Sequence, residues 1–203
     1  AADYRNTFQF PVLAITGSNG KTTTKELIRE VIAMRFKVYA TEGNLNNHIG
    51  VPLTILRVPA DCEFAIIEMG ANHQKEIESY CTFALPTHGL ITNCGKAHLE
   101  GFGGVEGVIE GKREMYQYLS ENNKLVFVNL EDPIQVEKTK TLKSYSFGIN
   151  KESADVNIAS IKANPFVEIS YSGLEITTHL IGLYNANNIC AALTIGKYFG
   201  IDD

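Results

Sequence analysis

The chain of 203 residues carries 18 Lys and Arg against 23 Asp and Glu, and this net charge of -5 argues against a surface built to bind nucleic acid or anionic lipid. Hydrophobic residues make up 44% of the sequence and charged residues 20%, which is typical of a globular domain and excludes a disordered one. No apolar run approaches the ~18–20 residues that span a bilayer, and the N-terminus lacks the apolar segment of a signal peptide. We therefore expect neither nucleic acid binding nor membrane insertion.

Short apolar runs alternate with helix-like stretches over the first three quarters of the chain. Five runs are too apolar for half-exposed strands, and they are residues 11–16, 36–41, 64–69, 88–93 and 124–130. Between them, residues 23–35 and 104–119 each place apolar side chains on one helical face. Alternating strands and helices predict βαβ units, and hence a three-layer α/β/α domain around a mostly parallel sheet.

The pattern changes near residue 150. Residues 155–183 hold three stretches of alternating apolar and polar residues, separated by turn-forming residues, and they predict a small antiparallel meander. A final helix is expected from about Asn187 to Tyr198. The sequence lacks an initiator Met and stops soon after this helix, so we expect a piece of a longer protein.

The cysteines bear on the compartment in which the protein works. Cys62, Cys81, Cys94 and Cys190 are scattered, and no two of them form a CxxC pair. They are interpreted as free thiols in a reducing compartment, which favours the cytoplasm, and as small buried hydrophobic residues.

The sharpest motif is TGSNGKTT, residues 16–23, which follows a predicted buried strand and opens a predicted helix. Two glycines in such a turn let backbone N–H groups surround an anion, while Lys21 adds charge for the phosphates and the Thr22 hydroxyl is a ligand for Mg²⁺. The common P-loop has a glycine five positions before the GK glycine, where this chain has Ile15 and its leading glycine is Gly17. The stretch therefore predicts a variant P-loop. An incidental glycine-rich turn is the less favoured alternative.

Other polar residues follow later predicted strands. Glu68 ends an apolar run, and a carboxylate at the carboxyl end of a central parallel strand lies in the crevice where such sheets bind ligands. There it is a candidate Mg²⁺ ligand, with a solvent-facing strand end as the alternative. Asn93 and His98 follow the next strand and can reach the same crevice, although a lone histidine is as often structural. Lys112 is, by its spacing alone, an ordinary solvated helix lysine.

Five stretches in order along the chain together resemble the Mur ligases. They are TGSNGKTT, GNLNNHIGVPLT (43–54), IIEMGANHQKEI (66–77), NCGKAHLEGFG (93–103) and GLYNANNICAA (182–192). The likeness is greatest to the members that add D-alanyl-D-alanine to UDP-N-acetylmuramoyl-tripeptide. It implies an ATP-dependent, amide-forming ligase of peptidoglycan synthesis that proceeds through an acyl phosphate. Residues 1–203 would be its single central ATP-binding domain, with the UDP-substrate domain and the C-terminal domain outside this chain.

The resemblance also implies roles for individual residues. The phosphates would lie against Gly17, Ser18, Asn19, Gly20, Lys21, Thr22 and Thr23. One Mg²⁺ would be held by Thr22 and Glu68, and a second by Glu68 and His98 with the help of a carbamylated Lys112. The catalytic residues would then be Lys21, Glu68, His98 and Lys112.

Four asparagines complete the implied site. Asn93 and Asn185 match adenine contacts of the family, although Tyr184 stands where relatives often have His. Asn44 and Asn47 are expected to face the UDP-sugar substrate. Turn and cap chemistry is the alternative for these asparagine-rich stretches.

Two other functions remain open. The same fold could serve another substrate, as in other Mur ligases or folylpolyglutamate synthases, and GNLNNHIGVPLT argues against this. A non-catalytic P-loop nucleotide-binding module is the second possibility, but such a module has no use for a second metal site built from Glu68, His98 and Lys112. We expect a monomer that folds alone but does not catalyse ligation without its flanking domains.

Overall fold

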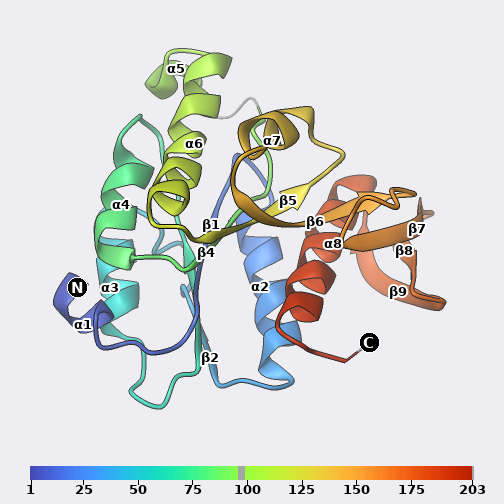
Figure 1. The fold of residues 1–203 in the computed structure, drawn as a ribbon, viewed down its shortest axis with the longest axis horizontal. Coiled ribbons are helices and arrows are strands. Elements are labelled where there is room, and N and C mark those ends of the chain that lie inside the picture. The colour runs from blue at the N-terminus through green and yellow to red at the C-terminus, as the bar shows by residue number, and fades with distance from the viewer. Residues whose placement is uncertain (96–98, 203) are drawn as a thin grey trace.

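One mixed sheet runs through the molecule (Figure 1). The computed structural model describes residues 1–95 and 99–202, and within them nine strands lie in the order β2-β3-β1-β4-β5-β6-β7-β8-β9. The strands are β1 (Val12–Thr16), β2 (Val38–Ala40), β3 (Phe64–Glu68), β4 (His88–Ile91), β5 (Leu125–Asn129), β6 (Lys143–Ile149), β7 (Val156–Ala163), β8 (Phe166–Tyr171) and β9 (Leu174–Ile181). All pairings from β2 to β7 are parallel, and β7, β8 and β9 pair antiparallel. The predicted parallel sheet and C-terminal meander are confirmed.

Helices cover both faces of the sheet, which confirms the predicted three layers. They are α1 (Ala2–Arg5), α2 (Lys21–Ala33), α3 (Gly50–Leu56), α4 (Glu76–Ala84), α5 (Leu99–Phe102), α6 (Val105–Glu121), α7 (Pro133–Lys138) and α8 (Leu183–Tyr198). Side chains of α3, α4 and α6 form a core with one face, and those of α2 and α8 form a second core with the other. Figure 1 shows the two groups on opposite sides of the strands. None of the helices in the described ranges is long and apolar enough to cross a bilayer.

The central strand β1 explains the uninterrupted apolar runs of the sequence. Val12 and Ala14 lie in one core, whereas Leu13 and Ile15 lie in the other. Successive side chains of a strand point to opposite faces, so both sets must be apolar where both faces are covered. β1 pairs in parallel with β3 on one side and β4 on the other, so its carboxyl end lies between the carboxyl ends of these two strands.

Several elements were not predicted from the sequence. β6 begins with the exposed residues Lys143 and Ser144 and so lacks a long apolar run, yet it joins β5 to β7 and makes the meander a continuation of the main sheet. α3 contains Gly50 and Pro52, which are poor helix formers, and α4 and α7 are short. Only α7 carried a readable signal, because Asp132 followed by a proline is typical of a helix start.

Candidate functional site

The phosphate loop, residues 16–23, leaves the central strand β1 and enters α2, as the motif predicts. Gly20 has a φ of +79°, a left-handed conformation that side chains adopt only under strain. A Cβ there would lie 2.8 Å from Oδ1 of Asn188 on α8. A Cβ at Gly17 would lie 1.9 Å from the Thr92 hydroxyl oxygen. A side chain at Gly17 or Gly20 would therefore have to displace Thr92 or Asn188.

The segment that follows β4 holds this loop in place. The Asn93 side chain accepts a hydrogen bond from the Asn19 N–H at 3.2 Å and donates one to the Asn19 carbonyl at 2.9 Å. The Thr92 hydroxyl donates to that carbonyl at 2.6 Å, and the Ser18 hydroxyl donates to the Gly95 carbonyl at 2.8 Å. These bonds hold the loop against the segment that follows β4. Asn93 thus lies at the loop as expected, and its adenine contact stays a prediction.

Lys21 is half-buried at the start of α2. Its ammonium donates to the Gly17 carbonyl at 2.6 Å and lies 3.4 Å from the Ser18 carbonyl. Burial lowers the pKa of Lys21, and the negative charge of Glu68 partly offsets that effect. An incompletely solvated cation beside a phosphate loop gains more from an incoming anion than a solvated cation would.

Glu68, at the end of β3, faces the loop and is only 1% exposed. Its Oε1 accepts hydrogen bonds from the Thr22 hydroxyl at 3.2 Å and from the Asn46 amide at 2.8 Å. Its Oε2 is buried without a hydrogen-bond partner among the described residues, and the Lys25 ammonium lies 3.9 Å away. The carboxylate does not face solvent, so the alternative of a solvated strand end is wrong.

Thr22 and Glu68 suit a Mg²⁺ ion. Both offer hard oxygen atoms, and Oε2 of Glu68 has unused capacity to accept within the part of the chain that the structure describes. Mg²⁺ usually takes one or two protein ligands and fills the rest of its shell with phosphate and water, so two such groups suffice. Within residues 1–95 and 99–202, no three His, Cys, Asp or Glu side chains gather as a metal-binding group. His98, the expected ligand of a second ion, lies outside the described residues.

Lys112 is not a solvated helix lysine, and that expectation is wrong. Its side chain is 2% exposed, and its ammonium lies 5.4 Å from the centre of the Phe102 ring. Burial, with a contribution from the positive charge of Lys21, lowers the pKa of Lys112 to about 8. Lys112 belongs to the buried stripe of α6 that includes Val108 and Met115, and this helical spacing was the signal that could have placed it inside.

The N-terminal half of α8 packs against the loop from the other face. Asn188 contacts Gly20 and donates to the Asn185 side chain at 3.0 Å, and Asn185 donates to the Ile181 carbonyl at 2.9 Å. Asn188 thus links Asn185 to the phosphate loop. This position is compatible with the expected nucleotide contact of Asn185, which stays a prediction. Tyr184, next to it, is 73% exposed.

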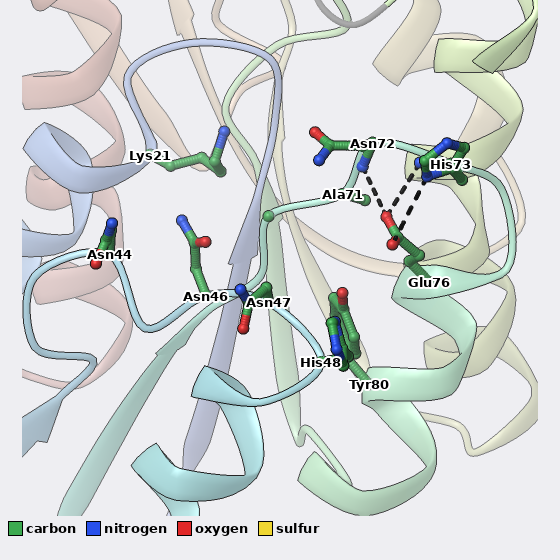
Figure 2. Close-up of a pocket in the computed structure, with 11 residues that line it drawn as sticks. Lys21, Asn44, Asn46, Asn47, His48, Ala71, Asn72, His73, Glu76 and Tyr80 are labelled. Atoms are coloured by element: carbon green, nitrogen blue, oxygen red, sulfur yellow. Dashed lines mark hydrogen bonds and ion pairs between the residues drawn. The ribbon is translucent and has the colours of Figure 1, made fainter. Parts of the chain in front are cut away.

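A cavity of about 420 Å³ opens beside Lys21 (Figure 2). It is lined by Lys21, Asn44, Asn46, Asn47, His48, Gly70, Ala71, Asn72, His73, Glu76 and Tyr80. Figure 2 shows Asn46 and Lys21 across the cavity from Asn72 and Glu76. Asn44 and Asn47 thus line a common pocket with the phosphate loop. The Asn47 side-chain oxygen also accepts the N–H groups of Ile49 and Gly50, at 3.1 and 2.9 Å, which is the cap chemistry proposed as the alternative.

Comparison with known proteins identifies the family. The sequence matches the Mur ligase middle domain over residues 15–196. The chain belongs to the Mur ligase family. It is 36% identical over 192 residues to the UDP-N-acetylmuramoyl-tripeptide–D-alanyl-D-alanine ligase of Bacillus subtilis, a match that covers 94% of this chain and 42% of the relative. The corresponding ligase of Haemophilus influenzae is 38% identical, with 93% of this chain and 43% of the relative covered.

Solved structures agree with this assignment. MurF from Acinetobacter baumannii superposes with a TM-score of 0.86 at 31% identity, covering 99% of this chain and 46% of that one. MurF from Thermotoga maritima in complex with ADP gives a TM-score of 0.83 at 29% identity, covering 99% of this chain and 48% of that one. The chain spans somewhat less than half the length of these Mur ligases. The resemblance inferred from the five motifs is confirmed.

Some site residues of this Mur ligase domain escaped the sequence reasoning. Asn46, Lys25 and Asn188 all touch a predicted site residue. Asn46 and Asn188 lie inside quoted motifs but were given no role, and Lys25 lies outside the motifs. Lys25 lies in the helix after the loop and is fully buried. It shares the buried face of α2 with Ile28 and Ile32, so helical spacing could have placed it inside, as for Lys112. His73 and Glu76 lie in the quoted GANHQKEI stretch, where the Glu76 carboxylate accepts the N–H of His73 at 3.0 Å.

Proposed function

We propose that this chain is the ATP-binding middle domain of a UDP-N-acetylmuramoyl-tripeptide–D-alanyl-D-alanine ligase, a cytoplasmic enzyme of peptidoglycan synthesis. The observation that carries the proposal is that the phosphate loop, the Thr22–Glu68 pair and buried Lys112 lie together, with Lys112 near enough to Lys21 for their charges to interact. Relatives that are 36% and 38% identical over nearly the whole chain carry this name. Residues 1–203 would act with a UDP-substrate domain and a C-terminal domain of the same monomeric protein.

The loop residues would bind the phosphates of ATP. The N-terminal end of α2 presents partial positive charge to the loop, and Lys21 adds a full charge. Mg²⁺ held by Thr22 and Glu68 would neutralise charge that builds up during phosphoryl transfer. Asn185 and Asn93 would face the adenine from opposite sides of the loop.

The pocket beside Lys21 would receive the peptide-bearing substrate. Asn44 and Asn47 provide amide groups on its wall, next to the ammonium that approaches the transferred phosphate. The carboxylate of the tripeptide would be positioned there for attack on the γ-phosphate, because proximity supplies much of the rate in such a reaction.

Lys112 would serve as a carbamate that helps His98 and Glu68 to hold a second Mg²⁺. Only a neutral amine adds CO₂, and an amine with a pKa of about 8 has a neutral fraction that a solvated lysine lacks at neutral pH. The burial of Lys112 would also protect the carbamate from water.

The Lys21→Ala variant tests nucleotide binding. Calorimetry with the 203-residue chain should show Mg-ATP affinity reduced by at least about 2 kcal/mol, because phosphate charge loses its partner. Lys37→Ala is the matched control, since the Lys37 ammonium forms an exposed ion pair with Asp61. Equal affinity in the Lys21 variant and the parent would refute the proposed loop function.

The acceptor specificity requires the intact protein. ADP release that depends on both UDP-N-acetylmuramoyl-tripeptide and D-alanyl-D-alanine supports the proposal. Turnover with another amino-acid acceptor instead would indicate a different Mur-type or folylpolyglutamate-type ligase. Binding without any turnover would indicate a nucleotide-binding module. Ligation by the 203-residue chain alone would contradict the proposed division of labour among domains.

A further inference from the structure

Asn46 lines the pocket and also contacts Glu68. It lies in the loop of residues 41–49, which connects β2 to α3 and carries Asn44 and Asn47 as well. Its amide nitrogen donates to Glu68 Oε1 at 2.8 Å, the shorter of the two side-chain hydrogen bonds that this oxygen receives from the described residues. The backbone carbonyl of Asn46 accepts the backbone N–H of Gly70 at 2.7 Å. Asn46 is thus bonded to Glu68 and to the second residue beyond it.

The packing around Asn46 leaves it little freedom. A Cβ at Gly70 would lie 2.9 Å from the Asn46 side chain, so the absence of a side chain at residue 70 lets the amide lie against the backbone. The Asn46 N–H donates to the Asn44 carbonyl at 2.7 Å, which closes a tight turn in the same loop. The amide therefore reaches Glu68 in one orientation, because its backbone is held on both sides.

The two carboxylate oxygens of Glu68 have different surroundings, and only Oε1 receives hydrogen bonds from the described residues. Oε2 is buried, no described residue hydrogen-bonds to it, and the Lys25 ammonium is 3.9 Å away. Oε1 receives both Thr22 and Asn46. If the Thr22 hydroxyl served as a ligand of Mg²⁺, Asn46 would be the remaining described side chain that donates a hydrogen bond to Oε1 and holds the orientation of the carboxylate.

We propose that Asn46 is the positioning residue that orients Glu68 for Mg²⁺ and joins the wall of the pocket to the metal site. This inference rests on the proposed function. Asn46 acts through Glu68, and it supports the ligand as outer hydrogen-bond partners support metal ligands generally. Since Asn46 also lines the pocket, a molecule that fills the pocket contacts the same side chain that holds Glu68.

Calorimetric titration of the 203-residue chain with ADP, in EDTA and at graded Mg²⁺ concentrations, tests this role. In Asn46→Ala, we expect ADP affinity in EDTA to stay within about twofold of the parent. The Mg²⁺ concentration that gives the half-maximal gain in affinity should rise about 10- to 100-fold. Glu42→Ala is the control, because Glu42 lies in the same loop and its carboxylate forms an exposed ion pair with Arg57. It should match the parent in both conditions.

Asn46→Leu separates the hydrogen bond from packing. Leu fills nearly the same space against Gly70 but has no donor, so we expect it to show the same loss of Mg²⁺ response as Ala. A normal response in Leu with a weak one in Ala would overturn the proposal in favour of packing. An unchanged Mg²⁺ response in both variants, or an equal loss of ADP affinity in EDTA, would overturn it as well. If the parent itself binds no nucleotide, the proposed function fails, a result that is distinguishable from all of these.

Discussion

Asn188 occupies the space that a side chain at Gly20 would need. A Cβ on residue 20 would lie 2.8 Å from Asn188 Oδ1, and the backbone there has a φ of +79°. The first helix after β1 and the last helix of the described chain therefore meet at the glycine of the phosphate loop. The close approach is possible only because residue 20 has no side chain.

Gly20→Ala should damage nucleotide binding more than its backbone strain alone predicts. Gly173 is a matched control, because it has the same φ of +79° and a Cβ added to it would meet no described atom within 4 Å. We expect Gly173→Ala to cost about 1–2 kcal/mol of stability by left-handed strain. Gly20→Ala should cost more and reduce ADP affinity at least about tenfold, as measured by urea unfolding and calorimetry. Equal stability losses with intact binding would show that the Asn188 contact is unimportant.

Asn93→Ala should weaken phosphate binding, because Asn93 makes two hydrogen bonds to the backbone of Asn19. Each lost bond costs about 1 kcal/mol, so we expect a roughly tenfold or greater loss of affinity. Inorganic triphosphate distinguishes the two roles of this residue. If Asn93 acts through the loop, triphosphate and ATP weaken together. If only ATP weakens, the residue acts on adenine and the loop account is wrong.

His88 predicts an acid sensitivity that is independent of the site. Burial, with a smaller contribution from Lys124, lowers the pKa of His88 from 6.5 to about 4 in the folded chain. The unfolded chain then binds more protons between these two values, so stability is complete above pH 6.5 and falls as the pH drops toward 4. The loss from this residue is at most about 3 kcal/mol.

His88→Phe is the variant that checks the effect of pH. Phe keeps the ring contact with Phe127 and has no titrating nitrogen, although it loses the hydrogen bond with Thr87. Urea unfolding at pH 7 and pH 4.5 should show a smaller pH-dependent loss in the variant than in the parent. Carboxylates elsewhere affect both proteins alike. Identical losses would show that His88 does not remain neutral in the folded chain.

The sequence predicted the sheet because its strands are buried on both faces, as in β1, where an apolar run leaves little ambiguity. It missed β6, since exposed Lys143 and Ser144 hide the strand and its register is set by β5 and β7. In the site, Thr22 and Glu68 could be placed beside each other because both follow predicted parallel strands, whose carboxyl ends share one side of the sheet. Contacts such as that of Asn46 with Glu68 depend on how a loop folds, which no local pattern encodes.

Lys112→Ala should abolish most turnover in the intact protein while nucleotide binding by the domain stays nearly intact. The proposed carbamate would hold a metal ion with His98, so its loss removes oxygen ligands without touching the phosphate loop. Because Lys112 is 2% exposed, Ala also leaves a cavity, and Lys112→Met fills the space and serves as the packing control. We expect Met to be folded and equally inactive.

Small carboxylates provide the decisive measurement for Lys112. Acetate added to Lys112→Ala can enter the space left by the side chain and supply oxygen atoms in trans, so partial recovery of ADP release is expected. The filled site of Lys112→Met should not respond, which makes it the control for a general salt effect. Normal turnover in either variant would refute the carbamate assignment. Inactivity of both variants without acetate rescue of Ala, together with weakened nucleotide binding, would instead assign Lys112 to the support of Lys21, whose charge contributes to its lowered pKa.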